Sequence, residues 1–154
     1  ACGLEYVSSF SLTGIDKEGL LPADEKIRLK IPHNGWQKEL HWNTYSLKNL
    51  GMSVTQPADR RRSSKTIGIG NVGNWSTKEY LPMGYLENRE TGSNLFWQIE
   101  HNGSWYWEIS DQDGYLYLKL SGPTEHQSGI VVKFTSRRNF YNDSRLCRFN
   151  RRWL

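Results

Sequence analysis

The chain has 154 residues, of which 36% are apolar and 13% aromatic, and its formal net charge is +4. This composition excludes a disordered chain, and no run of about 20 apolar residues exists that could form a transmembrane helix. The length suffices for one domain with its own core. Segments rich in Trp, Tyr and Thr, with many Asn and Gly, favour an all-β class.

The positive charge is confined to the end of the chain. Residues 1–129 contain 13 Lys and Arg against 15 Asp and Glu, a net charge of −2. Residues 130–154 contain seven basic residues and one Asp, a net charge of +6. The sequence therefore predicts a nearly neutral body, residues 1–129, followed by a basic tail, residues 130–154.

Three strands are predicted in the first third of the chain. Residues 4–13 form the first. Residues 25–31 alternate strictly between apolar and charged residues, which is typical of a strand with one buried face. Its inward side chains are Ile27, Leu29 and Ile31, and its outward side chains are Lys26, Arg28 and Lys30. Residues 32–35 break this strand, and residues 36–45 form an aromatic third strand.

Two later segments contain patterns that can bind phosphate. Residues 46–63 are expected to form a loop that contains Arg60, Arg61 and Arg62. A solvated loop is favoured over a phosphate or nucleic-acid contact, because no basic stripe elsewhere supports such a contact. Residues 68–73 match the dinucleotide pattern G-x-G-x-x-G letter by letter. Pro82 would break the helix that such a site needs. We therefore expect a strand over residues 64–72, whose glycines permit close backbone packing.

The stretch that anchors the predicted sheet is residues 95–120, LFWQIEHNGSWYWEISDQDGYLYLKL. Residues 78–87 predict a linker before it, and residues 88–93 a polar turn. A three-residue loop at 101–103 would form a hairpin that pairs Ile99 with Trp105, Trp97 with Trp107 and Leu95 with Ile109. Residues 111–114 form the next turn and residues 115–120 a third strand. The expected fold is an antiparallel β-sandwich with few or no helices.

The titratable residues predict no catalytic, cofactor-binding or metal-binding site. Glu100 and Glu108 would lie on the outer face of the hairpin and could form a glycosidase pair, but solvent-facing charges are favoured. Asp111 and Asp113 begin a calcium-loop pattern that lacks the required later Gly and Glu, so a turn is favoured. The four histidines are scattered, and a zinc site needs more ligands than the two cysteines offer. These residues are His33, His41, His101, His126, Cys2 and Cys147.

Two alternatives remain open at this point. Cys2 and Cys147 could form a disulfide, although two free thiols are favoured. Trp36, Trp42 and Trp75 are not needed for the predicted core, and exposed Trp faces stack on sugar rings. A free-standing carbohydrate-binding β-module is therefore the alternative function.

Five segments between residues 4 and 129 carry a family resemblance: LEYVSSFSLTGIDKEGLLP, IPHNGWQKELHW, GNWSTKEYLPMGYLEN, LFWQIEHNGSWYWEISDQDG and LYLKLSGPTE. They resemble the family 36 glycoside hydrolases, the large α-galactosidases. In that family the region belongs to an N-terminal β-supersandwich domain, which precedes a (β/α)8 barrel with two catalytic aspartates. The resemblance implies a fragment of a retaining enzyme that hydrolyses terminal α-galactosides without a cofactor.

The same resemblance implies that residues 1–154 are inactive alone. The family's nucleophile strand has a Lys-Trp-Asp core, and no Trp of this chain is followed by Asp, so no catalytic residue is carried over. The missing barrel domain is the expected partner, and uncovered sheet edges leave a homo-oligomer open. Neither nucleic acid nor a membrane is expected to bind. The first residue is Ala and no signal peptide is evident, which indicates a fragment or processed chain and slightly favours the cytoplasm.

The basic tail departs from the family pattern after residue 129. Its residues 133–141, KFTSRRNFY, can be encoded so that reading one base later gives N-L-Q-A-G-E-T-F-T, which resembles the family's continuation. We therefore hypothesise that the tail is an out-of-frame translation. A basic tail that binds nucleic acid is the third reading, and it predicts salt-sensitive binding.

Overall fold

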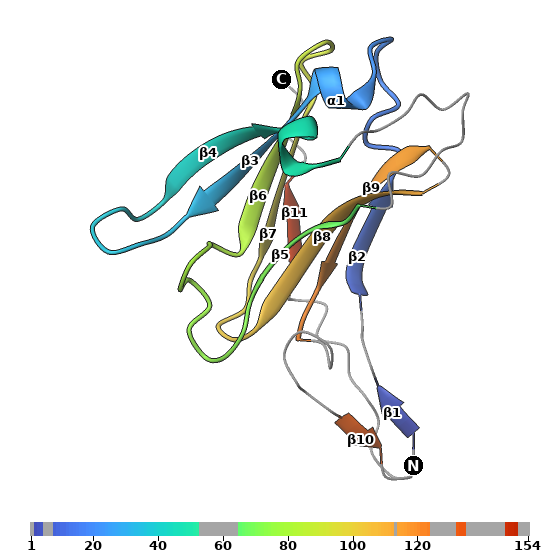
Figure 1. The fold of residues 1–154 in the computed structure, drawn as a ribbon. Helices are drawn as coiled ribbons and strands as arrows, with labels where there is room; N and C mark the ends of the chain where they lie inside the picture. The colour runs from blue at the N-terminus through green and yellow to red at the C-terminus, as the bar shows by residue number, and fades with distance from the viewer. Residues whose placement is uncertain are drawn as a thin grey trace.

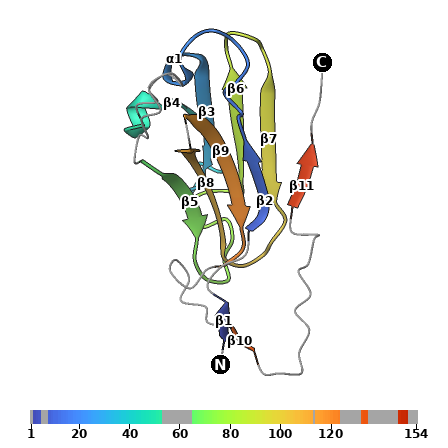
Figure 2. The same ribbon diagram turned by 90° about the vertical axis from the view of Figure 1, so that its right-hand side faces the viewer.

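A computed structural model describes residues 2–4, 8–52, 65–112, 114–123, 132–134 and 147–150, and side chains within residues 8–52, 65–112 and 114–123. The protein is an antiparallel β-sandwich, as predicted, with almost no helix (Figures 1 and 2). The two described helices have only four and three residues, α1 (Ala23–Lys26) and η1 (Lys48–Leu50). Neither is long or apolar enough to cross a membrane.

The first layer is a five-stranded sheet in the order β11-β7-β6-β3-β4. Strands β3 and β4 form one hairpin, β6 and β7 form another, β3 pairs with β6 between them, and β11 is added at the β7 edge. The chain between β4 and β6 includes β5, which belongs to the other sheet. The strands are β3 (Ile27–His33), β4 (His41–Ser46), β6 (Met83–Asn88), β7 (Asn94–Ile99) and β11 (Cys147–Asn150).

The second layer is a four-stranded sheet in the order β2-β9-β8-β5. Strand β8 lies between β9 and β5, so that Glu108 is opposite both Lys119 and Gly68. The strands are β2 (Ser8–Thr13), β5 (Ile67–Asn71), β8 (Trp105–Gln112) and β9 (Tyr115–Ser121). Apart from the two layers, β1 (Cys2–Leu4) pairs with β10 (Val132–Phe134).

The core lies between the two sheets and takes alternate residues from each. The predicted inward residues of β3 are buried, as are the tryptophans of β7 and β8. Trp97 and Trp107 meet edge to face across the core, with 5.2 Å between ring centroids, a geometry that favours aromatic pairs. The fully apolar buried set is Ala23, Ile27, Leu29, Ile31, Leu47, Met52, Ile67, Leu86, Trp97, Ile99, Trp105, Trp107, Ile109, Leu116, Leu118 and Leu120.

The predicted hairpin over residues 95–109 is wrong. Strand β7 pairs with β6 and β11, whereas β8 pairs with β9 and β5, so residues 100–104 carry the chain from one sheet to the other. The predicted burial of Trp97, Trp105 and Trp107 is nevertheless correct. When the chain crosses from one sheet to the facing sheet, the inward residues of both strands point into the space between the sheets. In a hairpin the same residues would share one face of a single sheet, so both arrangements bury the same side chains.

Three other predicted segments differ from the structure. The predicted linker at 78–87 contains most of β6, whose Gly84 leaves room for the Trp97 ring. Strand β3 continues through Pro32 to His33, because β6 pairs only with Ile27–Lys30 and leaves Pro32 a single strand neighbour. Strand β4 begins at His41, and the tip before it holds Gln37 and Leu40 at positive φ.

The charged residues around β3 also depart from the alternation. Lys26 is not outward: it belongs to α1, is buried, and donates from Nζ to the Gly19 carbonyl at 3.4 Å. Arg28 and Lys30 are half-buried on the other face of the strand, as predicted. The 88–93 turn is also as predicted. Its Asn88 is buried, and the side-chain oxygen accepts from the amides of Glu90 and Thr91.

Candidate functional site

The outer face of the four-stranded sheet is lined by polar and aromatic side chains. Register places the following residues on this face: Gly68 and Gly70 of β5, Tyr106, Glu108 and Ser110 of β8, Tyr117, Lys119 and Ser121 of β9, and Ser11 and Thr13 of β2. The alternate residues of the same strands form one wall of the core. Because no outward position in this group is aliphatic, the face is not a further apolar layer.

Tyr106 lies across β5 in the space that two glycine side chains would otherwise fill. A Cβ atom at Gly68 would overlap the Tyr106 hydroxyl, and one at Gly70 would lie 2.9 Å from Tyr106 Cδ2. One face of the ring therefore rests on the backbone of β5. The G-x-G spacing is confirmed as close packing within a strand, and the residues that follow it up to β6 contain no described helix.

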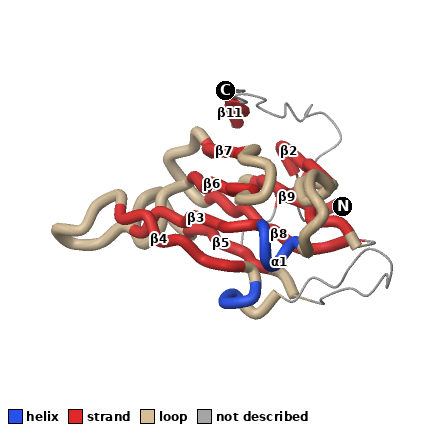
Figure 3. Tube along the Cα trace, turned by 90° about the horizontal axis from the view of Figure 1, so that it is seen from above, coloured by secondary structure: helices blue, strands red, loops and turns tan. Residues whose placement is uncertain are grey.

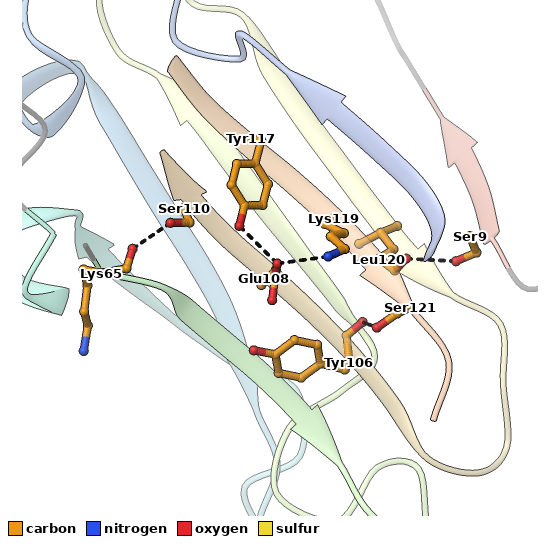
Figure 4. Close-up of polar contacts among 9 residues, drawn as sticks. All are labelled: Ser9, Lys65, Tyr106, Glu108, Ser110, Tyr117, Lys119, Leu120 and Ser121. Carbon is orange, nitrogen blue, oxygen red and sulfur yellow. Dashed lines mark hydrogen bonds and ion pairs between the residues drawn. The ribbon is translucent and has the colours of Figure 1, made fainter. Parts of the chain in front are cut away.

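Glu108 is held beside this ring by two partners from β9 (Figure 4). Its Oε1 accepts from the Tyr117 hydroxyl at 3.1 Å and lies 3.5 Å from Lys119 Nζ. The Glu108 side chain is only 17% exposed. A carboxylate that is fixed by two cross-strand partners is preorganised, because little conformational freedom is left for a ligand to remove.

Burial changes the proton affinities of both partners. Desolvation raises the pKa of Tyr117, and the Glu108 charge raises it further. Desolvation lowers the pKa of Lys119. Both shifts act on groups that contact Glu108, so the ion pair and the phenol hydrogen bond lie in a partly desolvated part of the sheet face.

The five-stranded sheet carries the same residue types in a different setting. Lys30 Nζ lies 3.1 Å from Glu87 Oε2 and 4.9 Å from the centroid of the Tyr85 ring. The Lys30 and Glu87 side chains are about twice as exposed as Glu108, at 33% and 34%. Here the ammonium occupies the ring face, so the tyrosine is already paired with a cation.

The glycosidase pair that was weighed against solvent-facing charges is not assembled. Glu100 is exposed in the connection after β7, whereas Glu108 lies in the middle of β8 in the other sheet. Asp111 is a buried residue of β8 and not a loop ligand, and β8 and β9 form the predicted hairpin at this point. Among the described residues, no group of three His, Cys, Asp or Glu is arranged to hold a metal ion.

His33 and His41 face each other across the β3–β4 pair, and His33 Nε2 lies 3.0 Å from the Tyr45 hydroxyl. His101 is half-buried in the connection between the sheets. The predictions for Arg60, Arg61, Arg62, Asp113 and His126, and for the side chains of Cys2 and Cys147, lie outside the described residues.

The two most exposed tryptophans among the described residues lie in loops. Trp36 is 93% exposed at the tip of the β3–β4 hairpin, which extends beyond the two packed sheets (Figures 1 and 3). Trp75 is 62% exposed in the connection between β5 and β6, and Trp42 of β4 is 37% exposed. All three tryptophans lie outside the buried core, as expected.

Comparison with family models, curated proteins and solved structures found no match to the chain. Of the polar cluster on the four-stranded sheet, only Glu108 was considered from the sequence. The cluster's one sequence signal is the repeated glycine at 68 and 70, which allows a large ring on the paired strand.

Proposed function

We propose that residues 4–129 form part of the non-catalytic β-domain of a family 36 α-galactosidase. The parent enzyme would hydrolyse terminal α-galactosides with retention of configuration, through two carboxylates on a barrel domain outside this region. The resemblance over five segments is the basis of the proposal. No catalytic residue is assigned to this chain.

The observation that supports the proposal most is the position of the segment WQIEHNGSW. It spans the end of β7, the connection between the sheets and the start of β8. Its Trp97, Ile99 and Trp105 are buried, and Trp105 Nε1 donates to the Ser76 carbonyl at 2.6 Å. The most distinctive part of the resemblance therefore contributes to the core, as expected for a segment that marks a domain type and not an active site.

The coding DNA around codon 130 tests this proposal. We expect a one-base shift there to restore the pattern N-L-Q-A-G-E-T-F-T and to lead into a barrel with a Lys-Trp-Asp core. The protein in the restored frame should hydrolyse nitrophenyl α-galactoside, whereas residues 1–154 should not. If no reading frame downstream continues the family pattern, the proposal fails. Turnover by residues 1–154 alone would contradict the assignment of the chemistry to the barrel.

Carbohydrate binding by a free-standing module is the second candidate function. The exposure of Trp36 and Trp75 favours it, because these rings are not used by the core. Titration with galactosides should then change the tryptophan fluorescence, and the change should be lost in Trp36→Ala or Trp75→Ala. An unchanged spectrum at millimolar sugar would contradict this candidate.

A further inference from the structure

The tripeptide His-Asn-Gly occurs twice in the chain, at residues 33–35 and at residues 101–103. The first copy begins at the last residue of β3, and the second lies in the connection from β7 to β8. Asn-Gly pairs are prone to deamidation, because glycine has no side chain to hinder the attack of its amide nitrogen on the asparagine side chain. Since the two copies have the same sequence, their surroundings in the fold decide which of them reacts.

Asn34 is held through both its main chain and its side chain. Its backbone amide donates to the Glu79 carbonyl at 2.8 Å, and its Nδ2 donates to the Thr77 carbonyl. The residue is half-buried. These two hydrogen bonds fix it against the connection between β5 and β6, and they must be released before its side chain can turn onto the following amide.

Asn102 is not held in this way. It is exposed, and its side chain makes no hydrogen bond to another described residue. The amide of Gly103 likewise donates to no described residue. The two groups that must meet for deamidation are therefore free to approach each other in the folded protein.

The two histidines are placed differently relative to their glycines. The His101 ring lies over Gly103, with Nε2 only 2.9 Å from the position that a Cβ atom would take there. His33 Nε2 instead lies 3.0 Å from the Tyr45 hydroxyl, and no atom of the described residues is within 4 Å of the Cβ position at Gly35. An imidazole nitrogen beside Gly103 can take up the amide proton, directly or through one water, as a general base does.

We propose that Asn102 is a site of deamidation in the folded protein, whereas Asn34 is protected. The amide nitrogen of Gly103 gives its proton to the His101 imidazole and bonds to Cγ of Asn102. The Cγ–Nδ2 bond then breaks, and the nitrogen leaves as ammonia with the proton that the imidazole returns. One water opens the resulting succinimide at either carbonyl, which gives aspartate or isoaspartate. This inference does not depend on the α-galactosidase proposal.

The place of Asn102 in the fold gives the reaction a structural consequence. Two residues later, the Ser104 hydroxyl accepts from the Gly73 amide at 2.9 Å, which ties the connection to the segment after β5. Deamidation adds a negative charge close to this contact, and isoaspartate also lengthens the main chain by one atom. The modification therefore falls on the segment that carries the chain from one sheet to the other.

The experiment is incubation of the full chain in 18O-labelled water at mildly alkaline pH, then tryptic digestion in ordinary water and tandem mass spectrometry. Residues 31–38 and 90–119 are separate tryptic peptides, so both asparagines are measured in one sample. The 18O label marks the products that formed before digestion. Asn102 should react about tenfold or more faster than Asn34, because Asn34 reacts only after two hydrogen bonds break. In urea the two rates should converge, because the tripeptides are identical.

Matched histidine variants test the role of the imidazole. His101→Ala should slow the reaction of Asn102 severalfold in the folded chain, because the base beside Gly103 is lost. The same variant in urea should react at nearly the rate of the unsubstituted chain. His33→Ala, at the equivalent position of the other tripeptide, should leave the rate at Asn102 unchanged.

Several results would overturn the inference. These are equal rates at the two asparagines in the folded chain, a faster reaction at Asn34, or aspartate without isoaspartate at Asn102, which would exclude the succinimide. An unchanged rate in folded His101→Ala would exclude the imidazole as the base. If a variant does not fold, the ratio of the two rates in the unsubstituted chain still decides. The α-galactosidase assay of the restored frame has no bearing on these outcomes.

Discussion

The outer faces of the two sheets carry a tyrosine, a glutamate and a lysine each, yet they place them differently. On the five-stranded sheet, Lys30 approaches both Glu87 and the ring of Tyr85, and all three residues are half-buried. On the four-stranded sheet, Lys119 pairs with Glu108, and Tyr106 rests on glycine backbone. The difference originates in β5, where Gly68 and Gly70 leave room for the Tyr106 ring to pack against the strand backbone. Local composition alone therefore does not determine how these side chains are arranged on a sheet.

The largest loss of stability is expected from a substitution in the core that the two sheets share. Trp107 is fully buried, and its ring meets Trp97 across the two sheets. We expect Trp107→Ala to lower the free energy of unfolding by about 3–5 kcal/mol. Urea unfolding measures it, with Trp36→Ala as an exposed control that should cost less than about 0.5 kcal/mol. Equal losses in the two variants would contradict the position of Trp107 in the core.

Adding one methyl group to β5 should remove the main difference between the faces. In Gly70→Ala, the new Cβ would lie 2.6 Å from the Trp105 carbonyl oxygen and 2.9 Å from Tyr106 Cδ2. We expect a loss of about 1–3 kcal/mol, because backbone and ring must both shift. Gly35→Ala is the matched control, since no atom lies within 4 Å of its added Cβ. Thermal or urea unfolding of the pair would show equal stabilities if the close packing on β5 were unimportant.

The two glutamates offer a milder comparison. Glu108→Gln should cost about 1 kcal/mol, because the half-buried Tyr117 hydroxyl and Lys119 lose a charged partner. Glu87→Gln should change stability by less than about 0.5 kcal/mol, because its ion pair with Lys30 is more solvated. Paired urea titrations measure the difference. An equal or larger loss for Glu87→Gln would show that exposure does not separate the two faces.

The smallest expected effect is in the ionisation of Tyr117. Burial, followed by the charge of Glu108, raises the pKa of this phenol. Glu108→Gln should lower the pKa of Tyr117, but burial should keep it above the ordinary value of about 10. NMR titration of 13C-labelled tyrosine rings measures this pKa. No change in the variant would exclude an electrostatic contact between the two side chains.

The same shift has a consequence for alkaline stability. Because folding raises the pKa of Tyr117, the folded state retains the phenol proton that the unfolded state loses. Its contribution to stability is complete below the unfolded pKa and declines as the pH rises through the folded pKa. The lowered pKa of Lys119 acts in the opposite direction in the same alkaline range, so a net dependence is best measured as the difference between the protein and Glu108→Gln.

Residue alternation predicted which side chains enter the core, but not which strands pair. Trp97 and Trp107 were correctly expected inside, whereas their strands proved to be in different sheets. Alternation specifies a face, and an arch and a hairpin give the same inward residues. Strand β6 was missed because Pro82 and Gly84 indicate a linker, although Gly84 makes room for Trp97.

The grouping of Tyr106, Glu108, Tyr117 and Lys119 could not have been predicted without the strand pairing. Gly68 and Tyr106 are far apart in the sequence, as are Lys119 and Ser11, and only the order of the four-stranded sheet makes them neighbours. By contrast, Trp36 was correctly expected outside the core, although it was placed in a strand and lies in the loop before β4.

The partnership of β2 with β9 sets an order for folding during synthesis. Ser8 of β2 lies opposite Ser121 of β9, so the first strand of this sheet must wait until more than a hundred later residues have left the ribosome. Strands β3, β4, β6 and β7 need only one another and can assemble earlier. These four strands of the five-stranded sheet can therefore form before β11 is made, and the four-stranded sheet then packs against them.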